Sequence, residues 1–266
     1  MRAKLAELQK EDREHMHPKE RDAQVMKNHE GTRLGYNAQA VVESEHGLIV
    51  AAEVTNEQND LHQLVPMIDK VKEELGTAAE ETLADSGYWN GEQLSGAEKN
   101  GYPVLVNLDA ADARNRGGDY DASQFMYDKE RDCCICPRGG ELKYERTRKP
   151  DGKPHPRVYR CSGYKECPVR WECSKDKQGR RVELSPHNES FLRQREKQSD
   201  GGKKSLLRQR MRIVEPVFAV VKERLGFRRW TVGGLEKVRA QWTFLAGLVN
   251  LLRLYAIWKE GKLVLA

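Results

Sequence analysis

The sequence lacks three features that would each define a class of protein. It has no apolar run that could cross a membrane: the longest, residues 242–258, contains Asn250 and Arg253 and is shorter than the ~20 residues that a spanning helix needs. It has no signal peptide, because a charged segment follows Met1 directly. It has no cysteine outside residues 133–173. The first two absences predict a cytoplasmic protein without a membrane partner.

Positive charge is concentrated in one stretch of an otherwise balanced sequence. The 266 residues carry a net charge of +5, and this length is typical of one large domain or two smaller ones. Residues 193–212 contain eight Lys or Arg and two acids. Such a stretch favours contact with a phosphate backbone, and a solvated basic loop is the alternative.

Hydrophobic patterns predict a mixed α/β sheet in the first half of the chain. Two short apolar segments around a Ser-Glu-His-Gly turn predict a β-hairpin, and helices alternate with further strands after it. The expected strands are residues 35–43, 48–55, 81–85 and 103–108, and the expected helices are 60–75 and 91–100. Asp60 is interpreted as the cap of the helix that it begins. This order of elements predicts an α/β fold.

Two acids are candidates for chemistry. Asp85 ends a strand, where open α/β sheets place functional groups, although Asp before Ser-Gly also favours an ordinary turn. Glu215 lies in Lys204–Leu225, which has the apolar spacing of one helix, and Pro216 predicts that this helix begins or bends there. A solvated glutamate is the alternative reading. A strand-end acid and a helix acid together suit a divalent metal such as Mg²⁺.

All six cysteines lie between these two acids. Cys133 and Cys136 form a C-x-x-C pair before a Pro-Gly turn, and the last three cysteines have five residues between successive members. Clustering without a secretory signal favours zinc over disulfides, and free thiols are the alternative. A four-thiolate site would fold a segment that is too polar to build its own core. The expected ligands are Cys136, Cys161, Cys167 and Cys173, with Cys133 as the alternate and His155 and His187 as substitutes.

Five segments resemble, in order, the C-terminal two-thirds of a DDE transposase. They are GTRLGYNAQAVVESEHGLIVAAEVTNEQNDLHQLVPMI (31–68), LADSGYWNGEQL (83–94), the cysteine block, RMRIVEPVFAVVK (210–222) and GLEKVRAQWTFLAGLVNLLRL (234–254). The sequence is most similar to transposases of bacterial insertion sequences that have a Y-R-E-K signature and a cysteine-bearing insertion. The Glu and Lys of that signature correspond to Glu215 and Lys222, whereas its Tyr and Arg fall at Arg208 and Met211.

The resemblance implies a fold, an activity and a set of partners. The fold is an RNase-H-like mixed sheet with flanking helices and a cysteine-rich insertion. Asp85 and Glu215 are the implied catalytic residues and Mg²⁺ ligands, holding two ions for in-line attack on phosphorus. Arg208, Arg210, Arg212 and Lys222 are the implied DNA contacts. The implied partners are the DNA ends of an insertion sequence, in the nucleoid, and further copies of the chain.

One departure from the family concerns its first catalytic aspartate. In the family this residue lies on the opening strand of the sheet, and nothing before Gly35 resembles that strand, since Asp12 and Asp22 lie in charged sequence. We therefore predict a truncated transposase that is inactive alone. The alternatives are a zinc-containing DNA-binding protein without catalysis, and a nuclease of related fold. The expected parts are a charged tail or remnant (1–28), the first part of the catalytic domain (29–118), the cysteine-rich insertion (119–190) and the catalytic-domain helices (191–266).

Overall fold

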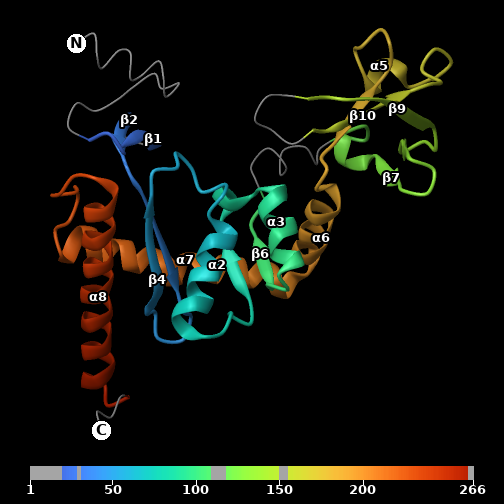
Figure 1. Ribbon diagram of the computed structural model, residues 1–266. Helices are drawn as coiled ribbons and strands as arrows, with labels where there is room; N and C mark the ends of the chain where they lie inside the picture. The colour runs from blue at the N-terminus through green and yellow to red at the C-terminus, as the bar shows by residue number, and fades with distance from the viewer. Residues whose placement is uncertain (1–19, 29–30, 109–117, 150–154, 263–266) are drawn as a thin grey trace, which may run out of the picture. The chain divides into compact units, whose positions relative to one another are not determined.

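The chain divides into two compact units. The computed structural model describes residues 20–28, 31–108, 118–149 and 155–262. Unit 1 comprises residues 1–106 and 199–266, and unit 2 comprises residues 107–198. The first contains both α-helices and paired strands, which confirms the mixed α/β class (Figure 1).

A β-hairpin and the last helix form the main core of unit 1. Strands β3 (Asn37–Val42) and β4 (Ile49–Thr55) pair antiparallel, as predicted. Helix α8 (Leu235–Lys259) packs against β4, and Figure 1 shows it alongside this hairpin. The buried residues of this core are Ile49, Val54, Val217, Val221, Val238, Trp242, Leu245, Ala246 and Val249.

A polar residue in α8 fixes its position on the hairpin. Asn250 interrupts the apolar run of the sequence, and its amide bonds both backbone groups of Ile49, accepting from the N–H at 2.8 Å and donating to the carbonyl at 2.9 Å. The Trp242 indole donates to the carbonyl of Gln39 at 2.8 Å. These bonds satisfy polar groups that burial would otherwise leave without partners.

Three more elements extend unit 1 in the predicted order. Helix α2 (Leu64–Leu75) packs against β4 and α3, and it ends at Gly76, which has a φ of 72°. Strands β5 (Thr82–Ala84) and β6 (Val104–Val106) pair parallel, and helix α3 (Gly91–Lys99) connects them. Within the described part of the chain, β3–β4 and β5–β6 form separate two-stranded sheets.

The segment before Gly35 differs from its prediction as a tail. Strands β1 (Gln24–Asn28) and β2 (Gly31–Gly35) form an antiparallel pair. Just before β1, the Glu20 carboxylate accepts from the Gly234 N–H at 2.8 Å, and Asp22 accepts from the Leu235 N–H at 3.0 Å. Two acids of the charged segment therefore satisfy free N–H groups at the start of α8, where negative charge is stabilising. Residues 1–19, including Asp12, lie outside the described residues.

The helix that carries Glu215 is longer than Pro216 suggested. Helix α7 (Gly201–Ala219) begins at Asp200, whose carboxylate accepts from the Gly202 N–H at 2.7 Å. Pro216 lies inside this helix, and a π-helical turn, η3 (Val220–Arg224), follows it directly. The helix packs against β3, β5 and β6. It therefore neither begins nor ends at the proline.

Unit 2 is built on one antiparallel sheet. Its strands run in the order β11 (Arg181–Leu184), β10 (Arg157–Cys161), β9 (Glu141–Thr147), β8 (Cys133–Ile135) and β7 (Met126–Asp128). The short helix α5 (Arg170–Cys173) lies between β10 and β11 in the sequence. The residues of its buried apolar cluster are Phe125, Cys134, Leu142, Tyr159 and Val182. Contrary to expectation, this segment therefore has an apolar cluster of its own, although a small one.

Residues 188–199 are also more regular than predicted. The polar composition of residues 185–202 predicts a loop with one helical turn, whereas the structure has helix α6 (Asn188–Ser199) there. Two of the helix's polar residues, Ser190 and Gln194, are buried. A helix that buries polar rather than apolar side chains gives little hydrophobic periodicity, which explains why the sequence pattern missed it. None of the helices that the structure describes is long and apolar enough to span a bilayer.

Candidate functional site

Asp85 occupies the strand-end position that the sequence predicted. It directly follows β5 and caps the 3₁₀ turn η1 (Ser86–Tyr88), where its carboxylate accepts from the Gly87 N–H at 2.9 Å. The side chain remains 41% exposed, so the second carboxylate oxygen is open to a ligand or a counter-charge. The position of Asp85 is therefore compatible both with an ordinary turn residue and with a functional acid.

Arg210 provides a counter-charge for Asp85. Its guanidinium Nη1 lies 3.4 Å from the Asp85 Oδ2, and its side chain is 20% exposed. Arg210 belongs to α7, the helix that packs against β5. The contact brings the helix that carries Glu215 to the end of the strand that carries Asp85.

Asp60 also lies in this site. It was predicted to cap a helix, and it does not. Helix α2 begins only at Leu64, and its cap position is Gln63. The Asp60 Oδ1 instead accepts from the side-chain amides of Asn37 at 2.7 Å and Gln39 at 2.6 Å. Asn37 and Gln39 are alternate residues of β3, so their side chains share one face of the strand.

The carboxylates of Asp60 and Asp85 converge on Gly87. A Cβ atom at Gly87 would lie 2.9 Å from the Asp85 Oδ1 and 3.1 Å from the Asp60 Oδ2. The absence of a side chain at this residue therefore lets the two carboxylates approach the same point. The sequence did contain a sign of this site: two amide residues, Asn37 and Gln39, at alternate positions of an otherwise apolar strand. In the structure Gln39 is only 3% exposed.

Tyr88 completes the polar network around these acids. Its hydroxyl donates to the side-chain oxygen of Gln39. Burial raises the pKa of the Tyr88 hydroxyl, the nearby charges of Asp60 and Asp85 raise it further, and Arg210 opposes them. The phenol is therefore neutral at physiological pH and acts as a hydrogen-bond donor that holds the Gln39 amide toward Asp60.

The close approach at Gly87 gives a stability prediction with a control in the same unit. Gly87→Ala places a methyl group against two carboxylates that are held by hydrogen bonds, so we expect it to lower the free energy of unfolding by about 1 kcal/mol. Gly96, inside α3, has only the Val65 Cγ2 at 3.5 Å from an added Cβ, which is an ordinary contact. Gly96→Ala is expected to raise that free energy by about 0.5–1 kcal/mol. Chemical denaturation measures both, and equal effects of the two substitutions would contradict the crowding at Gly87.

Glu215 and three of the basic residues lie on the exposed part of α7 and the turn that follows it. Glu215, Arg208, Arg212 and Lys222 are exposed, whereas Arg210 is half-buried against Asp85. At ~100° per residue, Glu215 lies about 140° around the helix from Arg210. Among the described residues, no three His, Cys, Asp or Glu side chains are grouped closely enough to hold a metal ion. The joint Mg²⁺ site of Asp85 and Glu215 remains a prediction.

In unit 2, the thiols of Cys161 and Cys173 have shifted pKa values, and other cysteines contribute to both shifts. Burial raises the pKa of the Cys161 thiol, and Cys167 and Cys136 raise it further. Burial likewise raises the pKa of Cys173, Arg180 opposes it, and Cys167, Cys136 and Cys161 add to the increase. These four are the cysteines that the sequence selected as zinc ligands.

The backbone around Cys136 forms a turn suited to a thiolate ligand. The Gly140 N–H donates to the Cys136 Sγ at 3.2 Å, and the Gly139 N–H donates to the Cys136 carbonyl at 2.8 Å. Gly139 has a φ of 81°, a conformation that favours glycine. Four sulfur donors suit Zn²⁺ by their chemistry, but the described cysteines are not grouped closely enough to hold a metal ion, so the zinc site remains a prediction.

Cys133 and Cys134 have a different environment. Both are buried in β8, with exposed fractions of 4% and 0%. Burial, followed by the charges of Cys133 and Asp132, raises the pKa of Cys134 to about 12, so its thiol stays protonated and packs as an apolar group. Neither residue is among the groups that shift the pKa of the Cys161 and Cys173 thiols.

Comparison with known proteins finds one domain family that part of the chain resembles. Residues 135–255 match the family model described as a transposase DDE domain. The match covers somewhat less than half of the chain, includes Glu215 and the cysteines from Cys136 onward, and excludes Asp60 and Asp85. No curated protein and no solved structure matches. The domain suggests a role in DNA transposition, which in turn implies DNA as a partner.

Proposed function

We propose that the chain carries the catalytic region of a DDE transposase of a bacterial insertion sequence, with an RNase-H-like fold. The observation that carries the proposal is the match of residues 135–255 to a transposase DDE domain. It is supported by the position of Asp85 after β5 and by its ion pair with Arg210, on the same helix as Glu215. We further propose that the first catalytic aspartate of the family is missing here, so that the chain alone is inactive.

Asp85 and Glu215 are the residues that would hold Mg²⁺. The bound ions would activate the attacking oxygen and stabilise the leaving oxygen in an in-line displacement at phosphorus. In the structure Arg210 forms an ion pair with Asp85. A DNA phosphate that binds Arg210 instead would leave the Asp85 carboxylate available to a metal ion. Exposed Arg208, Arg212 and Lys222 would position the phosphate backbone without reading bases.

Metal binding tests whether Asp85 and Glu215 act together. Two carboxylates that share an ion must lie within about 8 Å of each other. We expect Mn²⁺ to bind the wild type, and we expect Asp85→Ala and Glu215→Ala each to weaken that binding by at least about tenfold, since each removes a ligand. Electron paramagnetic resonance of free Mn²⁺ measures the affinity.

The control for metal binding is another exposed acid next to the same helix. Glu223 follows α7 in η3 and pairs with Arg228 at 2.6 Å. Glu223→Gln is expected to leave Mn²⁺ binding unchanged. Equal affinity of all four proteins, or a structure with the carboxylates of Asp85 and Glu215 more than about 15 Å apart, would contradict a shared ion.

The second candidate function is a zinc-containing DNA-binding protein without catalysis. The influence of Cys136 and Cys167 on the thiols of Cys161 and Cys173 is the support for zinc, and the exposed basic residues of α7 are the support for DNA binding. It predicts salt-dependent DNA binding that is indifferent to divalent metal and to Asp85→Ala. The two candidates therefore differ in the Mn²⁺ measurement.

A further inference from the structure

Arg210 differs from the neighbouring arginines of α7 in the face of the helix that it occupies. Arg208 and Arg212 are exposed. Arg210 lies in the less exposed row of the helix, and the other members of that row are Lys203, Leu207, Val214 and Val217. At ~100° per residue, Arg208 and Arg212 each lie about 160° around the helix from Arg210. A DNA backbone along the exposed side of α7 therefore contacts Arg208 and Arg212 and does not reach Arg210.

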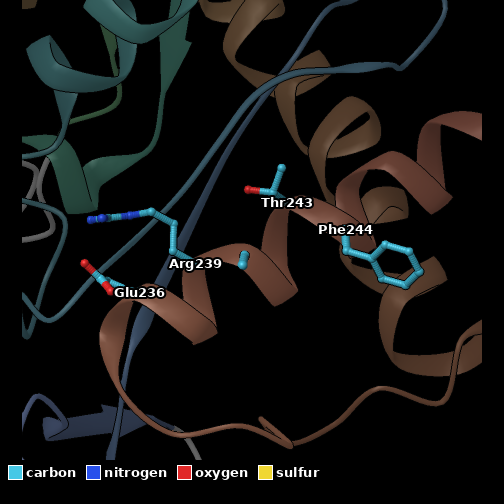
Figure 2. Close-up of a pocket in the computed structure, with 5 residues that line it drawn as sticks. Glu236, Arg239, Thr243 and Phe244 are labelled. Atoms are coloured by element: carbon cyan, nitrogen blue, oxygen red, sulfur yellow. The ribbon is translucent and has the colours of Figure 1, made fainter.

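The guanidinium of Arg210 keeps most of its capacity to bind an anion. Among the described residues, Asp85 is its single ion-pair partner, and the 3.4 Å between their atoms exceeds the ~2.7–2.9 Å of a strong charge-assisted hydrogen bond. Arg239 provides the contrast, because it donates both to the Glu53 carboxylate and to the Val54 carbonyl. Figure 2 shows Arg239 at the edge of a hollow on α8. A phosphate can therefore bind Arg210 at the cost of one long ion pair.

Arg210 also offsets the negative charge of the candidate site. Besides burial, the charges of Asp60 and Asp85 raise the pKa of Tyr88 and the charge of Arg210 lowers it, so these three charges surround one phenol. The Asp85 Oδ1 accepts from the Gly87 N–H, whereas its Oδ2 faces Arg210. The oxygen that is left for a metal ion therefore already faces a cation. Repulsion between like charges lowers the affinity of Asp85 for a second cation.

We propose that Arg210 couples DNA binding to metal binding: it pairs with Asp85 in the free protein and with a DNA phosphate when a divalent metal ion binds Asp85. This inference rests on the proposed function, because it takes Asp85 as a metal ligand. Each ligand removes the partner that holds the other ligand's site, so metal and DNA strengthen each other's binding by the same factor, about 5–150 in typical couplings. The free protein therefore binds metal weakly. Arg208 and Arg212 bind DNA independently of the metal.

The first experiment measures Mn²⁺ affinity without DNA, by electron paramagnetic resonance. Arg210→Gln removes the competing charge and should strengthen Mn²⁺ binding by at least about fivefold. The control is Arg224, an exposed arginine of η3. Arg224→Gln removes the same charge away from Asp85 and should change the affinity by less than about twofold, because exposed charges are screened over about 10 Å.

The second experiment measures binding of a labelled duplex oligonucleotide in EDTA, by fluorescence anisotropy. Asp85→Asn releases Arg210 without any metal, so it should strengthen DNA binding by at least about fivefold. In the Arg210→Gln background the same substitution should have less than about a twofold effect, because there is no guanidinium to release. Glu223→Gln, which removes the acid that pairs with Arg228, controls for the loss of one negative charge. Circular dichroism checks that every variant is folded.

Two results would overturn the proposal. One is a folded Arg210→Gln variant that binds Mn²⁺ no more tightly than the wild type. The other is an Asp85→Asn substitution that strengthens DNA binding equally with and without Arg210, since charge repulsion alone would then explain it. The proposed function fails in a different way, through Mn²⁺ binding that Asp85→Ala and Glu215→Ala leave unchanged. The measurement in EDTA contains no metal, so it decides the exchange at Arg210 even in that case.

Discussion

Removal of zinc from the purified protein is expected to unfold the sheet of unit 2 and leave unit 1 folded. The expected ligands are the thiolates of Cys136, Cys161, Cys167 and Cys173. Among the residues that the structure describes, the apolar cluster beside them has five buried members, Phe125, Cys134, Leu142, Tyr159 and Val182. Structural Zn²⁺ contributes roughly 10–16 kcal/mol in small zinc domains, which is as large as the whole stability of a typical domain, about 5–15 kcal/mol.

The measurement combines metal content with heteronuclear NMR of the two units. We expect one zinc per chain by elemental analysis, and we expect chelation to collapse the NMR signals of residues 118–184 while those of α8 and the β3–β4 hairpin persist. Cys136→Ser should lose the zinc, because it removes a ligand. Because binding displaces protons from thiols whose pKa is raised, zinc affinity should increase with pH.

The control is a cysteine of the same segment that is buried in the core. Cys134 is 0% exposed, and Cys134→Ala should lower stability but retain one zinc per chain. Cys133→Ala should retain it as well, because Cys133 is buried in β8 and is not among the groups that shift the pKa of Cys161 or Cys173. Purified protein without zinc, with all six thiols freely titratable, would contradict the zinc site.

The elements with a strong apolar period were predictable from the sequence. The β3–β4 hairpin, α2, α3 and α8 all bury one face, and this gives the pattern that sequence analysis reads. Asp85 was placed correctly because a strand followed by Asp-Ser-Gly fixes the strand's end. The four cysteines were chosen from their clustering in the sequence, and their zinc site stays a prediction, because the described cysteines form no group close enough to hold a metal ion.

The parts that were missed depend on contacts between residues distant in the sequence. Asp60 looked like a helix cap, because Asp is common at that position, whereas its partners are two amides of a strand more than twenty residues earlier. Glu20 and Asp22 looked like part of a tail, and they cap a helix that begins over 200 residues later. Local patterns carry no information about such partners.

The largest catalytic prediction is that this chain alone does not nick DNA. Two carboxylates, Asp85 and Glu215, can hold one ion weakly, and loss of a preorganised group from a two-metal site costs on the order of 10²–10³-fold in rate. We expect Asp60 not to act as the third acid, because two amide hydrogen bonds to its Oδ1 hold the carboxylate in place and leave only its Oδ2 for a metal. Among the described residues, no group of three acids, histidines or cysteines is arranged to bind a metal.

A supercoiled-plasmid assay in Mg²⁺ or Mn²⁺ tests this prediction. The wild type, Asp85→Ala and Glu215→Ala should give the same background level of nicked product. All three proteins should still bind the plasmid, because the basic residues of α7 are unchanged. The logarithm of the binding constant should fall linearly with the logarithm of the salt concentration. Robust nicking that both substitutions abolish would contradict the prediction. It would make Asp60, whose Oδ2 converges with Asp85 on Gly87, the third ligand, and Asp60→Ala would then have to abolish nicking as well.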